Sequence, residues 1–393
     1  MFLEDTSIEN ATVLIDYFRS PRPTSDIVKL TEALANSGSM LSSSNDVADI
    51  PSTGGPSSLS TILCPPFLVS LGYKVRKLGV PGRPAGGLDS LAQIYGYKTS
   101  FTPIELSKIL SKKYQYVHLD SSDTFAPADS TLFSIRKKLG AIDIPQLAIA
   151  SILSKKLSMG INAVVLDVRA SRFGNFGHTV EECRKNATIF CDVAERFGIK
   201  AHAVICESTI PFQPYIGRLE SLQAVYQALF GRADEWLSNH IDYCMNLCGI
   251  LGNSVDSDLY KFRDMFIDSA RQAFIDNLEL QGSSYELFKK KIATPYVSVF
   301  VEADSAGFAS YDLREIRKLI VDAQDSQAAS EVKYPDPLGM VLLAKPGDKI
   351  FPGDKVLEIR SRCSDSKIPD CSACFSISDK APLSYSDRYI EVL

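Results

Sequence analysis

The sequence lacks any long uninterrupted run of apolar residues, and it also lacks any long run of basic residues. A membrane-spanning helix needs about 20 consecutive apolar residues, so we expect no membrane segment. Lysine and arginine number 42 against 47 aspartate and glutamate residues, and the net charge is −5. Because nucleic-acid-binding domains usually carry a basic excess, we also expect no nucleic-acid partner.

Histidine is scarce, with four residues, and the nine cysteines are scattered along the chain. The closest group, Cys363, Cys371 and Cys374, contains one CxxC pair and no nearby histidine. Structural zinc sites use four such ligands, so we expect neither a metal nor another cofactor. The first residues, MFLEDTSIEN, are acidic and do not form a signal peptide. Scattered cysteines suit a reducing compartment, and we expect a cytoplasmic protein.

The best-defined unit is a predicted helix that begins at Pro145, with Asp143 as its expected N-cap, and ends at Gly160. The apolar residues of this helix recur at helical spacing, at Leu147, Ala150, Leu153 and Leu157. The next residues, INAVVLDV over 161–168, are typical of a buried strand. Other helices and strands are expected at 26–36, 59–71, 74–78, 102–113, 116–119, 179–198, 200–206 and 292–313.

Ser151 and Lys155 stand four residues apart and therefore share one face of this helix, and Arg136 comes from the preceding segment. Two cations can polarise ring carbonyls, and a hydroxyl can donate to or accept from a ring nitrogen. The three side chains together would suit a planar, carbonyl-rich ligand such as a pyrimidine base. The alternative is that Arg136 and Lys155 are ordinary solvated helix charges.

A resemblance favours the binding interpretation. Residues 132–157, LFSIRKKLGAIDIPQLAIASILSKKL, resemble the base-binding segment of the thymidine/pyrimidine-nucleoside phosphorylase family. The resemblance implies that Arg136, Ser151 and Lys155 bind the pyrimidine, although Lys137 stands where the family has aspartate. Residues 121–129, SSDTFAPAD, resemble the family segment that closes over the base, which implies that Phe125 forms an apolar wall for the ring.

A Ser-Thr-Gly-Gly turn, Ser52, Thr53, Gly54 and Gly55, precedes an apolar helix. Glycines let backbone N–H groups approach an anion, and a helix N-terminus attracts negative charge. The turn resembles the family's phosphate-binding K-H-S-T-G-G signature. The family lysine and histidine are replaced by Ile50 and Pro51.

A second loop, 79–91, resembles the family's other glycine-rich phosphate loop and retains Gly86, Gly87 and Asp89. The family's phosphate-contacting serine and threonine align with Lys77 and Gly87, and a further family serine aligns with Thr61. A dianionic phosphate needs positive charge and several donors. We therefore expect Lys77, Arg76 or Arg83 to supply replacement charge, or water to replace phosphate as the acceptor. Hydrolysis requires a general base, for which Asp49 and Asp89 are candidates, although both also suit a loop-bracing role.

The resemblance implies an α/β fold class: a small all-helical domain, a larger α/β domain with a mixed sheet, a β-rich C-terminal region, and a cleft between the domains. The expected boundaries are 1–40 and 127–160 for the helical domain, 41–126 and 161–290 for the α/β domain, and 291–393 for its C-terminal region. A homodimer is also implied, but the N-terminal helical segment is too short to supply the family's extra interface helices.

The sequence therefore predicts cleavage of the N-glycosidic bond of a pyrimidine nucleoside or nucleotide, with Arg136, Lys155 and Asp89 as catalytic residues. Phosphate, as a possible co-substrate, or water would accept the pentosyl group. Two alternatives remain: a phosphoribosyltransferase of the anthranilate type, which needs an acidic Mg²⁺ site, and an inactive pyrimidine-binding paralogue.

Overall fold

The structure is a computed structural model of the whole chain. The residues that it describes are 8–82, 86–110, 116–121, 124–252, 263–327, 333–361, 369–382, 388 and 390–393.

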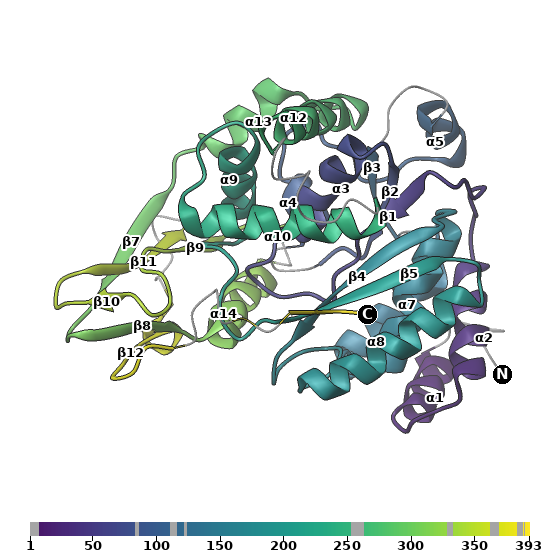
Figure 1. Cartoon of the computed structure of the whole chain (residues 1–393), viewed down its shortest axis with the longest axis horizontal. Coiled ribbons are helices and arrows are strands. Elements are labelled where there is room, and N and C mark those ends of the chain that lie inside the picture. Colours follow the sequence, from purple (N-terminus) through teal and green to yellow (C-terminus); the bar gives the residue numbers. More distant parts are fainter. Residues whose placement is uncertain are drawn as a thin grey trace.

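A six-stranded mixed sheet forms the centre of the molecule (Figure 1). Its strands lie in the order β13-β5-β4-β1-β2-β3, and all are parallel except β13, which pairs antiparallel with β5. The bounds are Val47–Asp49 (β1), Lys74–Gly79 (β2), Tyr116–Asp120 (β3), Ala163–Ala170 (β4), Lys200–Glu207 (β5) and Ile390–Val392 (β13). Every residue of β4 is buried, as expected for a parallel strand with both faces covered.

Helices cover both faces of the sheet, and alternate residues of β4 separate the two cores. Ala163 and Val165 face α3 (Ser60–Ser70), α9 (Arg218–Leu229), α10 (Glu235–Leu251), α12 (Arg263–Leu280) and α13 (Tyr285–Ile292). Val164, Leu166 and Val168 face α1 (Ile8–Phe18), α2 (Thr24–Ala35), α6 (Pro127–Lys138), α7 (Pro145–Ser158) and α8 (Val180–Glu195). Two short helices, α4 (Gly87–Leu91) and α5 (Pro103–Leu110), complete this part of the chain.

The C-terminal part is rich in β-structure, as expected. One antiparallel sheet contains β6 (Tyr215–Ile216), β9 (Leu338–Leu342), β11 (Lys355–Ser361) and β7 (Val297–Glu302). A second contains β10 (Lys349–Ile350), β8 (Gly307–Tyr311) and β12 (Phe375–Ser378), preceded by the short helix η1 (Ser372–Cys374). Helix α14 (Leu313–Ser326) lies between these sheets and the central sheet (Figure 1). The fold class is confirmed, whereas the exact domain boundaries stay a prediction.

Some details of the helix ends differ from expectation. Ile144, not Asp143, is the N-cap of α7, and no side chain caps this helix. Pro145 occupies the first turn, where its missing N–H needs no partner. The capping boxes that begin at Thr102 and Thr179 form hydrogen bonds to the backbone amides of Glu105 and Glu182.

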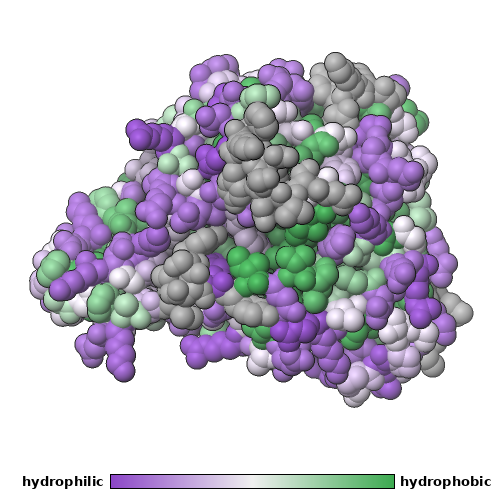
Figure 2. All heavy atoms as spheres, viewed as in Figure 1, coloured by the Kyte–Doolittle hydropathy of each residue, from purple (hydrophilic) through white to green (hydrophobic). Residues whose placement is uncertain are grey.

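Polar residues cover most of the face shown in Figure 2, including the region of α8, and apolar residues gather near its centre. Within the described part of the chain, no helix is long and apolar enough to cross a membrane.

Two glycines that end helices provide a matched test of packing. Gly140 follows α6 and Gly160 follows α7, and both have φ of +62°. A Cβ at Gly140 would meet nothing within 4 Å, whereas one at Gly160 would lie 2.5 Å from the carbonyl oxygen of Ser42.

We therefore expect Gly140→Ala to lower the free energy of unfolding by about 1 kcal/mol, the cost of the left-handed conformation. Gly160→Ala should cost at least about 2 kcal/mol, because a backbone clash adds to the same strain. Urea denaturation of the two variants would measure both costs, and equal losses would contradict the packing at Gly160.

Candidate active site

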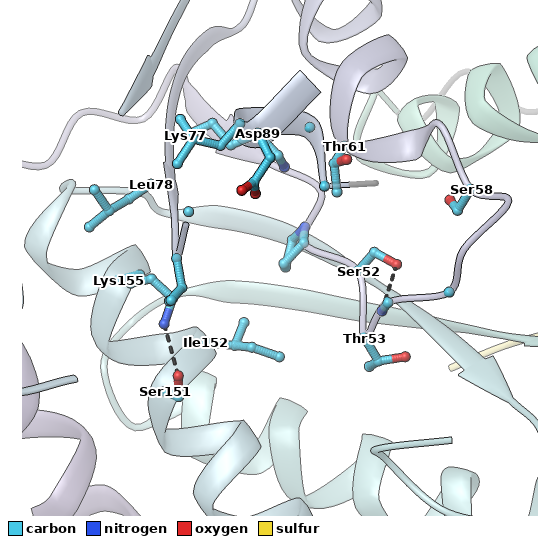
Figure 3. A pocket seen from close by; sticks show the side chains of 18 of the residues that line it. Ser52, Thr53, Ser58, Thr61, Lys77, Leu78, Asp89, Ser151, Ile152 and Lys155 are labelled. Atoms are coloured by element: carbon cyan, nitrogen blue, oxygen red, sulfur yellow. Dashed lines mark hydrogen bonds between the residues drawn. The ribbon is translucent and has the colours of Figure 1, made fainter. Parts of the chain in front are cut away.

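A cavity of about 220 Å³ opens beyond the carboxyl ends of β1 and β2. In parallel α/β sheets, this edge is where ligands usually bind. Figure 3 shows its walls: Ser151, Ile152 and Lys155 project from α7, while Thr61 and Asp89 lie on the opposite side and Ser52 and Thr53 close a third side.

The structure brings the three predicted base-binding residues together. Ser151 and Lys155 line the cavity, and Arg136 lines a smaller adjoining cavity of about 60 Å³ that Ser151, Ser52 and Thr53 also line. Arg136 and Lys155 are only 2% and 7% exposed. They are therefore not solvated helix charges, and that alternative is wrong.

Each of these cations has a fixed orientation. Lys155 Nζ donates to Asp129 Oδ2 at 2.5 Å and to Ser151 Oγ at 2.9 Å. Arg136 Nε and Nη2 donate to the carbonyl oxygens of Ala141 and Ile142, at 3.0 and 2.8 Å. The loop between α6 and α7 therefore holds the guanidinium in place.

The Ser-Thr-Gly-Gly turn is fastened to the end of β4. Thr53 donates its amide to the Asp167 carbonyl at 3.0 Å, and the Arg169 amide donates to Thr53 Oγ1 at 2.9 Å. Ser52 Oγ accepts the Gly54 amide at 3.2 Å (Figure 3). Gly54 and Gly55 have φ of +105° and +141°, a conformation that glycine adopts without strain.

Lys77, predicted to bind phosphate, is instead held by protein groups. Its Nζ donates to Asp49 Oδ1 at 2.7 Å and to the Ile50 carbonyl at 2.8 Å. Lys156 pairs with the other oxygen of Asp49. Burial alone would raise the pKa of Asp49, but Lys156 and Lys77 outweigh it and hold this pKa well below its usual value. Burial lowers the pKa of Lys156 to about 8, against the opposing effect of Asp49.

The second glycine-rich loop also lines the cavity, through Gly86, Gly87 and Asp89. A Cβ on Gly87 would lie 2.8 Å from Thr61 Oγ1, so glycine permits the close approach of α4 to α3. Asp89 Oδ1 accepts the Gly82 amide at 2.8 Å and Arg218 Nη2 at 3.1 Å. These contacts favour the bracing role of Asp89 over that of a general base.

Phe125 is buried in the apolar core and is not among the residues that line the cavity, whereas the phenyl ring of Phe133 does line it. Arg76 donates to the carbonyl oxygens of Ser42 and Met159, away from the cavity. Arg83 lies outside the described residues.

Several cavity residues were missed by the sequence reasoning. Asp129, in the APAD segment, does not line the cavity but pairs with Lys155, and a search for a partner of this lysine could have found it. Asn175, from the loop after β4, and Arg317, from α14, line the cavity. Both come from segments whose position no local pattern reveals.

His118 on β3 is another missed residue and is 2% exposed. Its Nδ1 shares a hydrogen bond of 3.1 Å with the Tyr116 hydroxyl. Burial, followed by the charge of Lys77, lowers the pKa of His118 to about 3. The ring is therefore neutral at pH 7 and presents a dipole, not a charge, to the cavity.

Cations exceed carboxylates around the cavity. Lys77, Lys155, Lys156 and Arg317 line it, and Asp89 is the one carboxylate among its lining residues. Asp49 and Asp129 lie behind these lysines as their ion-pair partners, and Arg218 pairs with Asp89. This local excess of positive charge suits a ligand that carries or develops negative charge.

Within the residues that the structure describes, no three His, Cys, Asp or Glu side chains gather to hold a metal ion. Cys371 and Cys374 are buried in the core of the β-rich part, and Cys363 lies outside the described residues.

The amino-acid sequence is similar to curated proteins that share one name. No family model matches the chain. The chain is 26% identical over 347 residues to pyrimidine-nucleoside phosphorylase of Staphylococcus haemolyticus, covering 84% of this chain and 79% of that protein. It is 25% identical over 362 residues to pyrimidine-nucleoside phosphorylase of Geobacillus stearothermophilus, covering 86% and 80%.

Among solved structures, anthranilate phosphoribosyltransferase from Saccharomyces cerevisiae is 14% identical, with 68% of this chain and 79% of that chain covered and a TM-score of 0.43. Its complex with PRPP and Mg gives 15% identity, the same coverage and a TM-score of 0.44. TM-scores below 0.5 are too low to assign a function to this chain.

The depressed pKa of His118 predicts an acid-dependent loss of stability. Between pH 6.5 and 3, the unfolded chain protonates this histidine and the folded chain does not. The free energy of unfolding should therefore fall by about 1.4 kcal/mol for each pH unit below 6.5 from this group alone. His118→Gln should remove that part of the slope, as measured by urea denaturation at pH 6.5, 5.5 and 4.5.

The matched control is His178→Gln, because the His178 ring lies at an exposed loop. An unchanged slope in His118→Gln would mean that His118 is protonated in the folded protein.

Proposed function

We propose, from the premise that this chain is a divergent member of the pyrimidine-nucleoside phosphorylase family, that it transfers the pentosyl group of a pyrimidine nucleoside. One observation carries the proposal: Ser151 and Lys155 form one side of the cavity, with Arg136 in the smaller cavity that adjoins it, and the turn formed by Ser52 to Gly55 closes another side. A base on the first side and an acceptor on the second would place the sugar between them.

The base side supplies electrostatic stabilisation of the leaving group. As the bond from the anomeric carbon to the ring nitrogen breaks, its electron pair stays on the base and negative charge spreads to the ring carbonyls. Arg136 and Lys155 would stabilise this charge, and Ser151 would hold a hydrogen bond at the ring edge. Phe133 and Ile152 supply the apolar part of the wall.

Phosphate is the better-supported acceptor. Activation of water requires a general base, but Asp89 is bound to Arg218 and Asp49 is paired with two lysines. His118 has a pKa of about 3 and would be a weak base. A phosphate anion is already nucleophilic: one of its oxygens bonds to the anomeric carbon as the base departs, and the base nitrogen then takes up one proton from solvent.

No group of three His, Cys, Asp or Glu side chains that could hold a metal ion occurs among the described residues, and no specific observation favours the anthranilate-type alternative. The direct experiment is to incubate the protein with uridine, thymidine or cytidine, with and without phosphate, and to identify the sugar product by mass spectrometry. A sugar 1-phosphate supports phosphorolysis. Free sugar formed without phosphate identifies water as the acceptor, and no base release contradicts the proposed activity.

Arg136→Ala should lower kcat/KM for the nucleoside at least about a hundredfold, the scale of losing one charge-stabilising donor. Arg196→Ala is a matched control, because Arg196 is exposed at the end of α8 and does not line the cavity. Circular dichroism would verify folding, and unchanged turnover in Arg136→Ala would contradict the base-site assignment.

Lys155 needs a paired substitution, because removing it alone leaves Asp129 buried and unpaired, at a cost of about 3–5 kcal/mol. The double variant Lys155→Met with Asp129→Asn should remain folded and lose at least about a hundredfold in kcat/KM. Steady-state kinetics beside the single variant Asp129→Asn would separate the contribution of Lys155. Full activity in the double variant would exclude Lys155 from the reaction.

A further inference from the structure

Arg317 differs from the other cations that line the cavity. Lys77 and Lys156 pair with Asp49, and Lys155 pairs with Asp129. Arg317 comes from the exposed side of α14, and in the described part of the chain no carboxylate forms an ion pair with it. Among the cationic side chains that line this cavity, Arg317 is therefore the one whose charge no carboxylate of the described residues neutralises.

Arg317 also stands at the junction of two cavities. A second cavity, of about 1070 Å³, extends from the Ser-Thr-Gly-Gly turn toward α14 and the loop after β4. The residues that line both cavities are Thr53, Gly54, Gly55, Pro56, Asn175 and Arg317. A ligand bound against the turn would therefore lie near Arg317 in either cavity.

Basic residues outnumber acidic ones along the second cavity. Its basic members are Arg169, Arg172, Arg314, Arg317 and Lys318, and its acidic members are Asp143, Asp312 and Asp322. Asp312 caps α14, because its Oδ1 accepts the backbone amides of Arg314 and Glu315. The resulting field would favour an anion at the junction.

The Gly54–Gly55 turn has the features of an anion cradle. The Gly54 amide donates to Ser52 Oγ, so the backbone donor that this turn offers to an anion is the amide of Gly55. A Cβ at either glycine would meet nothing within 4 Å, so the glycines are needed for their conformation and the space beside them is open. Backbone donors without a nearby cation are a weak site, and Arg317 supplies the cation.

We propose that Arg317 and the Gly54–Gly55 turn together bind a phosphoryl group. This inference rests on the proposed function and deepens it, because Arg317 would supply the charge that the hydrophobic Ile50 cannot supply. The phosphoryl group has two possible sources: inorganic phosphate as the acceptor, or a 5′-phosphate on the nucleoside. Both require the same chemistry, a bidentate guanidinium together with a backbone amide donor.

Isothermal titration calorimetry with inorganic phosphate, uridine and uridine 5′-monophosphate would test the site without turnover. The unmodified protein should bind phosphate or the monophosphate, and Arg317→Gln should weaken that binding at least tenfold while uridine binding stays unchanged. Arg317→Lys should bind more tightly than Arg317→Gln but less tightly than the unmodified protein, because lysine keeps the positive charge and lacks the bidentate guanidinium. Arg196→Gln is the matched control.

The arms of the experiment distinguish the two sources. A loss confined to inorganic phosphate identifies the acceptor site, and a loss confined to the monophosphate identifies a substrate ester. The proposal is overturned if the unmodified protein binds neither phosphate probe, if Arg317→Gln binds both normally, or if uridine binding falls equally. Absence of base release with an intact Arg317-dependent phosphate affinity would contradict the proposed activity alone.

Discussion

The buried carboxylate of Asp49, at the end of β1, organises the site. It receives Lys77 from β2 on one oxygen and Lys156 from α7 on the other. A buried charge is tolerated only when it is paired and hydrogen-bonded, and loss of one partner costs about 3–5 kcal/mol. Two strands and one helix must therefore meet at this point. Lys155, the residue before Lys156, and Ser52, three residues after Asp49, are placed by the same contact.

A second buried carboxylate, Asp167, fixes the opposite wall. Its side chain accepts Ser60 Oγ and the Tyr243 hydroxyl, each at 2.7 Å, and Arg169 Nη2 at 2.5 Å. The Arg169 guanidinium also stacks 3.7 Å from the Phe212 ring centroid. The backbone of the same strand end pairs with Thr53. A rigid polar network thus supports a turn whose glycines would otherwise be free to move.

These networks divide the cations into two groups with different tasks. Lys77 and Lys156 are held by Asp49 and stabilise the carboxyl edge of the sheet. Lys155 and Arg136 are oriented at the cavity by Asp129 and by backbone carbonyls. The site is therefore electropositive through residues on several elements, although Ile50, beside the Ser-Thr-Gly-Gly turn, carries no charge.

The sequence by itself determined the local features. The spacing of Ser151 and Lys155 along an amphipathic helix, the turn at Gly54–Gly55, and the buried strand, predicted over 161–168 and observed over 163–170, all follow from propensities within a few residues. It could not determine which charges are paired, because Lys77 lies 28 residues from Asp49 and Asp89 lies 129 residues from Arg218. The same limit made Phe125, not Phe133, look like the wall of the cavity, and hid Arg317 in a distant helix. Only the tertiary structure decides such matters, because ion pairing and exposure depend on distances between segments that no local pattern encodes.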